Sequence, residues 1–295
     1  MASTPRVTVF GSLHYDIAVN GPARPRKGET VTGTSWYPKC GGKGGNQAVS
    51  AARAGARTEM IGAVADDDFG RTLIANLSTK GVGHAHVRRN AARSTGMSVA
   101  IFDADGDYGA VIVSGANLTL GDEDAEAARA LLEETAILVL QNEIPDAANV
   151  AAARAVRAAG GQVLLNAAPA RVLSDDLKGL VDILVVNAIE AEMLSGVDVV
   201  ETLDGALQAA RLLARSWPHV VVTAGGAGVA YASGQGAALT IDPIRITVAS
   251  THGAGDEFIG MFAASLTRGL GFAEALHLAN RAAAKLVSTP EDERV

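Results

Sequence analysis

Hydrophobic and polar positions follow two alternating patterns along most of the chain. Short runs rich in β-branched residues, such as 7–10 and 220–223, alternate with longer Ala-rich amphipathic stretches, such as 146–159. This succession is typical of βαβ units, which build a parallel sheet covered by helices. The pattern therefore predicts an α/β fold with a central, mostly parallel sheet flanked by helices.

The predicted strands are apolar over several consecutive residues, as expected of strands that are buried on both faces. They are 7–10, 59–64, 136–140, 162–166, 182–186 and 220–223. The predicted helices share a high content of Ala, Leu and Arg and a helical spacing of apolar positions. They are 47–54, 69–80, 146–159, 188–194, 204–216, 254–268 and 273–287.

Two regions, 13–37 and 96–114, break the alternation because each reads as extended chain without a helix between its strands. They predict a second, smaller sheet inserted into the larger unit. The Asp and Gly residues of 103–107 are typical of a hairpin turn and predict one between strands 97–102 and 109–113. Since no repeat or Pro-rich linker divides the chain, we expect one domain over 1–295.

Composition narrows the possible partners and compartments. The 295 residues carry 25 Lys and Arg against 32 Asp and Glu, a net charge of −7. This balance, with scattered Arg, argues against nucleic acid or an anionic membrane as a partner. The chain has no apolar run long enough for a membrane span and no apolar signal core after Met1, so we expect a cytoplasmic protein. Its single cysteine, Cys40, excludes an internal disulfide and a Cys-based zinc site.

The first candidate for chemistry is a glycine cluster at 41–48, Gly-Gly-Lys-Gly-Gly-Asn-Gln-Ala, which leads into a predicted helix. Glycines let the backbone approach a ligand closely, while Lys43 and Asn46 offer a charged donor and an amide that can bind hydroxyl groups. The spacing does not match the phosphate loop GxxxxGK[ST]. Alternatively, the cluster is a flexible turn that caps the helix.

The second candidate is 251–256, Thr-His-Gly-Ala-Gly-Asp, directly before an apolar helix. A Gly-rich turn that opens a helix presents backbone N–H groups and the positive end of the helix dipole, which suits a phosphoryl group. Asp256 at such a site is explained if it accepts a proton from an incoming hydroxyl group. Taken alone, the motif favours a plain Asp cap at the start of the helix.

Together the two motifs resemble the signatures of the PfkB (ribokinase-like) carbohydrate kinase family, and the ribokinases within it most closely. The resemblance runs nearly from end to end of the chain. Further segments that look like landmarks of the family, in the expected order, are 11–16, 28–30, 67–70, 94–96, 115–117, 166–171, 187–190 and 223–228. This resemblance implies a ribokinase-like fold, Rossmann-like in its main sheet, with a small β lid formed by 12–38 and 96–115.

The resemblance also implies roles for individual residues. Asp256 is the expected base, and the backbone of Gly253, Ala254 and Gly255 is the expected anion hole for the γ-phosphoryl group. The expected sugar-binding residues are His14, Asp16, Gly42, Lys43, Asn46 and Glu143, together with Asp256. The expected ATP-binding residues are Asn187, Thr223, Gly225, Gly228, Thr251, His252 and Asn280. Glu190 is expected to act on Mg²⁺ through the bound phosphate, so the expected cofactors are ATP and Mg²⁺.

Four features depart from the ribokinase pattern. His14 stands where ribokinases carry an Asn that binds the sugar, which favours a substrate other than ribose over a simple packing change. Ser250 replaces an Asp that helps to bind an activating monovalent cation, and the tail 291–295 lacks the loop that completes that site. These two departures predict that activation by potassium is absent or altered. His252 and Glu257 flank the GAGD motif. His252 is interpreted either as a contact to phosphate or the purine or as an exposed residue without a role. Glu257 either adds negative charge beside Asp256 or, as an acid in the first turn, interacts favourably with the helix dipole.

The leading hypothesis is an ATP-dependent kinase for a hydroxymethyl group of a ribose-like sugar. A nucleoside kinase for a purine nucleoside or pseudouridine is the alternative, because nucleosides carry the same ribosyl hydroxymethyl group. A third hypothesis, from a different class, is a sugar or nucleotide sensor without catalysis. Ribokinases commonly pair through the lid, so we also expect a homodimer.

Overall fold

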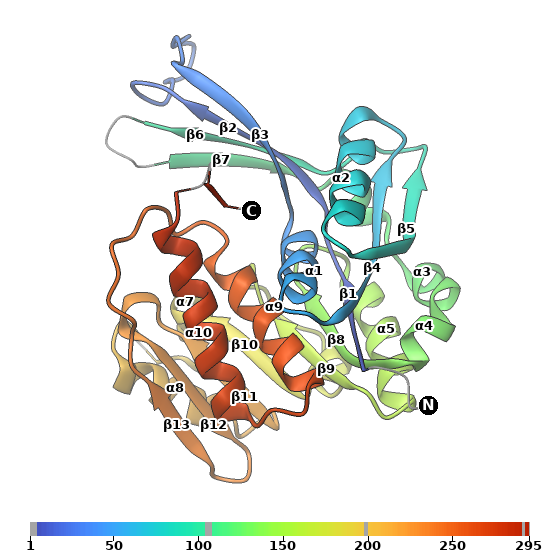
Figure 1. Ribbon diagram of the computed structural model, residues 1–295, viewed down its shortest axis with the longest axis vertical. Coiled ribbons are helices and arrows are strands. Elements are labelled where there is room, and N and C mark those ends of the chain that lie inside the picture. Colours follow the sequence, from blue (N-terminus) through green and yellow to red (C-terminus); the bar gives the residue numbers. More distant parts are fainter. Residues whose placement is uncertain (1–4, 104–107, 198–199, 291–292, 295) are drawn as a thin grey trace.

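A nine-stranded sheet crosses the larger part of the molecule (Figure 1). The computed structural model describes residues 5–103, 108–197, 200–290 and 293–294. The strands of the large sheet lie in the order β13 (Ala238–Ile241), β12 (Val229–Ser233), β11 (His219–Thr223), β10 (Ile183–Asn187), β9 (Gln162–Asn166), β8 (Thr135–Gln141), β1 (Arg6–Phe10), β4 (Arg57–Ala65) and β5 (Gly83–Asn90).

The large sheet is parallel except at one edge, where β12 pairs antiparallel with both β11 and β13. Its central strands are buried on both faces, and their side chains alternate between two hydrophobic cores. In β11, Val220 and Val222 belong to one core and Val221 to the other. Burial on both faces explains why the strands read as continuous apolar runs in the sequence.

Helices cover both faces of the large sheet (Figure 1). One core is closed by α1 (Lys43–Arg53), α2 (Asp68–Thr79), α9 (Ala254–Thr267) and α10 (Phe272–Ser288). The other is closed by α3 (Asp122–Ala127), α4 (Arg129–Glu133), α5 (Asp146–Ala158), α6 (Asp175–Lys178), α7 (Ala188–Ser195) and α8 (Leu203–Leu213). Two 3-10 turns, η1 (Gly115–Thr119) and η2 (Gly225–Ala227), also lie in the described part of the chain. The predicted α/β class is confirmed.

A second sheet of four strands extends beyond the large one (Figure 1). Its strand order is β3 (Ser35–Gly41), β2 (His14–Asn20), β6 (Met97–Phe102) and β7 (Tyr108–Val113). β2 pairs antiparallel with β3 but parallel with β6, so the sheet is mixed. Both regions predicted as extended chain therefore meet in one small sheet. Most of the hairpin turn predicted at 103–107 lies outside the described residues.

The main difference from the predicted elements lies in the glycine cluster. Helix α1 begins at Lys43, four residues earlier than predicted, so Lys43 to Asn46 form its first turn and not a loop. Gly42 caps it with φ of +84°, and a Cβ there would lie 2.7 Å from the His14 backbone nitrogen. Only glycine therefore lets the lid strand and the helix approach so closely.

Several short or polar elements were not predicted. They are β5, β12, β13, α3, α4 and α6. β5 reads Gly-His-Ala-His-Val-Arg-Arg-Asn and lies at an edge of the sheet, where polar residues meet solvent. In the described part of the chain, no helix is long and apolar enough to cross a membrane.

Candidate active site

The candidate residues gather where parallel strands end and helices α1, α7 and α9 begin. A pocket of about 140 Å³ lies at this edge of the large sheet. Asn187 ends β10 and Thr223 ends β11, and both line the pocket. The other predicted residues that line it are Lys43, Glu190, Thr251, Gly253, Ala254, Gly255 and Asp256. Chain topology thus brings residues from positions 43 to 256 to one cavity, as expected at the carboxyl edge of a parallel sheet.

Asp256 lies in the first turn of α9 and is buried, with 9% of its surface exposed. The side chain of Asn46 donates to its Oδ2 at 3.0 Å, and Gln47 donates to its Oδ1 at 2.9 Å. Burial raises the pKa of Asp256, and the charge of Glu143 raises it further, while Lys43 and the two amides lower it. A carboxylate with a raised pKa is a stronger base.

Gln47 is a site residue that the sequence analysis did not select. It is fully buried, and besides Asp256 it donates to Oδ1 of Asn166 at 3.1 Å. Its own side-chain oxygen accepts from Gln141 at 2.8 Å. Gln47 therefore connects Asp256 to the ends of β8 and β9. The only sequence signal was its position within the glycine motif.

The backbone before α9 turns sharply at a glycine cap. Gly253 caps the helix in the left-handed region, with φ of +79°. The first amides of a helix lack partners within it and lie at the positive end of its dipole. The N–H of Ala254 turns back to donate to the Thr251 carbonyl at 3.3 Å, a long hydrogen bond. Gly253, Ala254 and Gly255 all line the pocket beside Asp256.

Glu190 and Asn187 form a reciprocal cap at the start of α7. The Asn187 side chain accepts from the Glu190 N–H at 2.9 Å, and Glu190 Oε2 accepts from the Asn187 N–H at 2.8 Å. Burial raises the pKa of Glu190, while the Asn187 N–H and the charge of Lys43 lower it. Lys43 thus acts electrostatically on both carboxylates of the small pocket.

A second group of polar residues lies where the small sheet meets the large one. Glu143 follows β8, and its Oε2 accepts from the Ser12 hydroxyl and from the Lys43 N–H at 3.0 Å. Asp16 lies on β2, and its Oδ1 accepts from Ser98 of β6 at 2.5 Å. His14 is buried, with Nδ1 at 3.9 Å from Glu143 Oε2.

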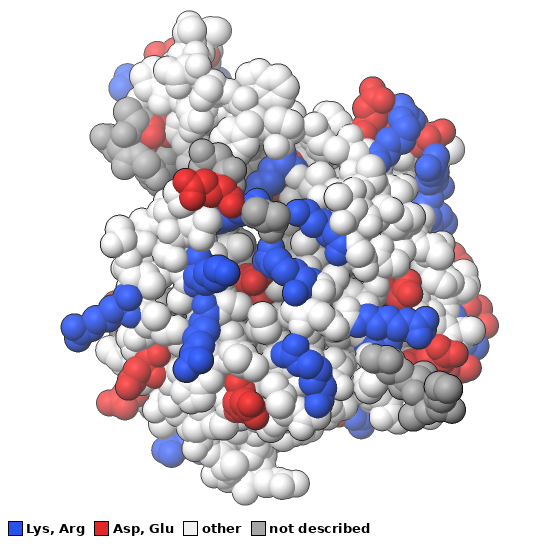
Figure 2. All heavy atoms as spheres, viewed as in Figure 1, with Lys and Arg blue, Asp and Glu red and all other residues white. Residues whose placement is uncertain are grey.

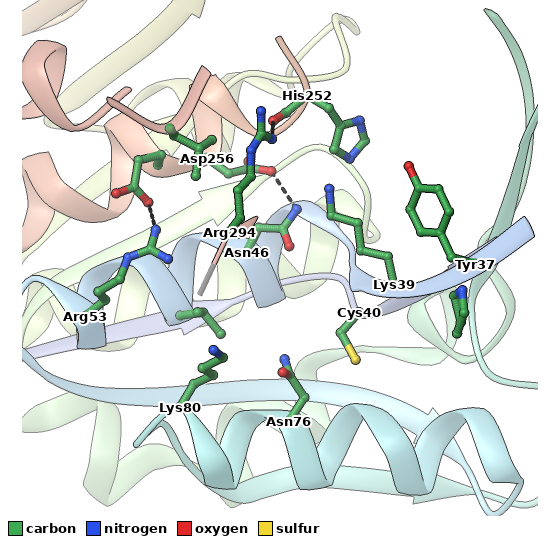
Figure 3. A pocket seen from close by; sticks show the side chains of 15 residues that line it. Tyr37, Lys39, Cys40, Asn46, Arg53, Asn76, Lys80, His252, Asp256 and Arg294 are labelled. Atoms are coloured by element: carbon green, nitrogen blue, oxygen red, sulfur yellow. Dashed lines mark hydrogen bonds and ion pairs between the residues drawn. The ribbon is translucent and has the colours of Figure 1, made fainter. Parts of the chain in front are cut away.

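A larger pocket of about 700 Å³ opens on the other side of Asp256 (Figure 3). Its lining comes from β3, α1, α2, the segment before α9, the first turn of α9, α10 and Arg294. Labelled residues include Tyr37, Lys39, Cys40, Asn46, Arg53, Asn76, Lys80, His252, Asp256 and Arg294. Lys and Arg side chains surround the hollow on this face of the molecule (Figure 2). Gly253 and Asp256 line both pockets, so the carboxylate stands between them.

Four of the predicted nucleotide contacts are not among the residues that line the small pocket. Gly225 and Gly228 lie in and after η2, just beyond the end of β11. Asn280 lies on α10, and its side chain donates to the Asp242 carbonyl at 3.2 Å. His252 lines the larger pocket, whereas its neighbour Thr251 lines the smaller one.

A parallel sheet with a mixed small sheet above its carboxyl edge, and a carboxylate beside a helix amino terminus, define a class of phosphotransferases. The family model "pfkB family carbohydrate kinase" matches residues 4–293. The chain belongs to this family.

Known relatives and structures agree with this assignment. Ribokinase from Haemophilus influenzae is 33% identical over 278 residues, which cover 94% of this chain and 90% of the relative. Deoxyribokinase from Salmonella typhi is 33% identical over 259 residues, or 87% of this chain and 84% of the relative. The structure of Arabidopsis thaliana ribokinase complexed with ribose and ATP is similar with a TM-score of 0.89, 30% identity and coverage of 97% and 94%.

Proposed function

We propose that this protein transfers the γ-phosphoryl group of ATP to the hydroxymethyl group of a ribose-like sugar. The observation that carries the proposal is the position of Asp256, which lines both pockets and is held by Asn46 and Gln47. Asn46 of the proposed sugar site binds Asp256 directly, and the amino terminus of α9 beside Asp256 suits a phosphoryl group. The carboxylate is therefore proposed to lie between the two substrates, as in-line transfer requires. The similar ribokinases support ribose or a close relative as the acceptor.

The polar residues below the small sheet are the proposed sugar site. Asp16 and Glu143 are carboxylates that can accept hydrogen bonds from sugar hydroxyls, and Lys43 and Asn46 are donors. His14 and Gly42 complete the set. The small sheet lies over this group, and we propose that it excludes water, which would otherwise compete with the sugar for the phosphoryl group.

Asp256 is the proposed general base. It removes the proton from the sugar hydroxyl as the oxygen attacks phosphorus, and the bond from phosphorus to the ADP oxygen breaks. Its burial favours this role because the raised pKa strengthens the carboxylate as a base. The amides of Gly253, Ala254 and Gly255 stabilise the charge that develops on the transferred group.

The nucleotide is proposed to lie on the side of the small pocket. Thr223 and Asn187 end adjacent strands there, with Thr251 across from them. Gly225 and Gly228 follow Thr223 and extend the proposed site along the sheet edge. His252 and Asn280 are the most distant members of the proposed set, which the sequence resemblance suggested.

Mg²⁺ fits the donor set of the small pocket. No group of three or more His, Cys, Asp or Glu among the described residues forms a metal site by itself. Mg²⁺ commonly binds through one or two carboxylates together with water and substrate phosphates, so such a cluster is not required. Glu190 is the proposed carboxylate, oriented by Asn187. The ion would neutralise charge on the phosphates.

The test is ADP formation from ATP and Mg²⁺ over a panel of ribose, 2-deoxyribose, hexoses and nucleosides. The Asp256→Asn variant removes the base, and Asp204→Asn, an exposed carboxylate at the start of α8, is its matched control. We expect a sugar to be turned over and Asp256→Asn to lose about a hundredfold or more in kcat, as expected for a general base.

Two outcomes would contradict this function. A nucleoside preferred over every free sugar would favour the alternative kinase. Tight ATP binding without turnover of any panel member would favour a sensor.

We further propose a homodimer formed through the small sheet. Trp36, Val111 and Ile112 lie on this sheet with 66%, 69% and 58% of their surfaces exposed, and large exposed apolar groups commonly mark an interface. Analytical ultracentrifugation of Trp36→Glu should show a monomer if this surface pairs the subunits. A location in the cytoplasm, where ATP is available, stays a prediction.

A further inference from the structure

Arg294 binds the segment that leads into the proposed anion hole. Its guanidinium donates to the Ser250 carbonyl at 2.8 Å through Nη2 and to the His252 carbonyl at 2.8 Å through Nη1. Its Nε donates to the Thr289 carbonyl at 2.9 Å. One permanently charged side chain therefore joins the segment before α9 to the end of α10.

The contact with His252 constrains the next peptide group. In a trans peptide the carbonyl and the following N–H point in opposite directions. Since the His252 carbonyl points to Arg294, the N–H of Gly253 points away from it. Gly253 begins the motif and lines both pockets, so this contact fixes the orientation of a group beside the proposed phosphoryl site.

Backbone carbonyls that converge on one point are ligands for a simple cation. Here the carbonyls of Ser250 and His252 converge on a guanidinium instead. The side chain of Ser250 provides no charge, and its hydroxyl accepts from the His252 N–H at 3.3 Å. The segment thus receives its positive charge from within the chain.

We propose that Arg294 is a positioning residue for phosphoryl transfer, which holds the segment 250–253 in the active orientation and makes a soluble monovalent cation unnecessary. The proposal rests on the kinase function proposed above. It also gives a physical reason for Ser250. Where the Arg294 guanidinium already binds the backbone carbonyls, an Asp at position 250 is not needed to help to bind a dissociable cation.

The test compares the unaltered protein with Arg294→Ala, Arg294→Lys and Arg281→Ala. Arg281 is the matched control because it is an exposed arginine on α10 that lines the same groove as Arg294. Rates are measured in potassium chloride and in tetramethylammonium chloride at equal ionic strength. For the unaltered protein and for Arg281→Ala, we expect the rate in one salt to be within about twofold of the rate in the other. Arg294→Ala should lose about tenfold or more in kcat relative to the unaltered protein, with an almost unchanged KM for the sugar.

The kcat of Arg294→Lys should lie between those of the unaltered protein and Arg294→Ala. A single ammonium keeps the positive charge but lacks the planar guanidinium that binds three carbonyls at once. Adding guanidinium chloride at concentrations too low to unfold the protein should restore part of the activity of Arg294→Ala. A kcat of Arg294→Ala equal to that of Arg281→Ala, or a strong requirement of the unaltered protein for potassium, would overturn the proposal.

Hydrogen exchange separates this inference from the kinase function. Backbone amides of 250–256 should exchange faster in Arg294→Ala than in Arg281→Ala, even if no panel sugar is turned over. Turnover that is absent in every variant would count against the kinase function alone. Equal exchange in the two variants would overturn the role of Arg294 whatever the activity.

Discussion

The side-chain amide of Gln47 donates a hydrogen bond to Oδ1 of Asp256 at 2.9 Å, across the contact between α1 and α9. A second donor, Asn46, binds the other carboxylate oxygen. Both are neutral amides, so they orient the carboxylate without the full charge that a Lys or Arg in their place would add. Asp256 is therefore fixed in orientation while burial keeps its pKa raised.

Replacement of Gln47 should change the ionisation of Asp256. A hydrogen bond to the charged form lowers a carboxyl pKa, so its loss in Gln47→Leu raises the pKa. The base then becomes protonated at higher pH, and the acidic limb of the kcat profile moves to higher pH. We expect kcat at neutral pH to fall about tenfold.

Gln208→Leu is the matched control, because Gln208 is exposed on α8. It should retain both the rate and the pH profile of the unaltered protein. An acidic limb that stays in place in Gln47→Leu, despite a lower kcat, would show that Gln47 does not act through the pKa of Asp256.

The raised pKa of Asp256 also predicts how stability depends on pH. The folded protein retains this proton to a higher pH than the unfolded chain does, so the carboxyl group lowers stability as pH rises from about 4 toward the raised pKa. Asp256→Asn lacks this effect. Its Tm relative to that of the unaltered protein should therefore increase from acidic to neutral pH.

Thermal unfolding across this pH range checks the prediction, with Asp204→Asn as the control. The exposed Asp204 should give a Tm difference that does not change with pH in this way. A constant Tm difference for Asp256→Asn would mean that the pKa of Asp256 is the same in the folded and unfolded chains.

Glu190→Gln should weaken the binding of Mg²⁺ that activity requires, while helix α7 is retained. A glutamine oxygen can still accept from the Asn187 N–H, so the reciprocal cap at α7 is retained. The negative charge is lost, and we expect the Mg²⁺ concentration for half-maximal activity to rise about tenfold, as for loss of one charged contact. Magnesium titrations of the initial rate measure this.

Glu192→Gln provides the matched control for Glu190→Gln. Glu192 lies two residues further along α7, and its carboxylate accepts from the Val200 N–H at 2.9 Å. It is not among the residues that line the small pocket. An equal shift in both variants would indicate a general charge effect and not a contact with the ion.

Much of the large sheet could be predicted because its strands have strong local signals. β9 extends over the predicted residues 162–166, since a strand buried on both faces is a continuous apolar run. β12 and β13 were not predicted, because Val-Ala-Tyr-Ala-Ser and Ala-Leu-Thr-Ile are short and lack a long run of β-branched residues. The start of α1 was also missed, because Gly44 and Gly45 are poor helix formers that tertiary contacts place in the first turn.

The part of the candidate site that could be predicted consists of residues that lie close together in a sequence motif. Asp256 and the start of α9 lie in one motif, and the structure brings Lys43, Asn187 and Thr223 to the same pocket. Arg294 gives no signal of this kind. Its role depends on a long-range contact with carbonyls 42 and 44 residues away, and backbone acceptors have no signature in a sequence.

The close approach of α1 and α9, on which the position of Asp256 depends, requires Gly260. A Cβ at this position would lie 2.4 Å from the Ser50 Cβ and 2.6 Å from the Ala51 backbone nitrogen. In Gly260→Ala, α9 must therefore move away from α1, which carries Asn46 and Gln47. We expect a loss of about 1–3 kcal/mol in the free energy of unfolding, as for other overpacked cores, together with a lower kcat.

Gly271→Ala is the control for Gly260→Ala, because Gly271 is exposed and a Cβ there would meet no atom within 4 Å. Chemical denaturation and steady-state kinetics distinguish the two variants. Displacement of α9 would also strain the ion pair between Arg53 and Glu257, which joins the same helices. If Gly260→Ala retained both the stability and the kcat of Gly271→Ala, the distance between the helices would not control the orientation of Asp256.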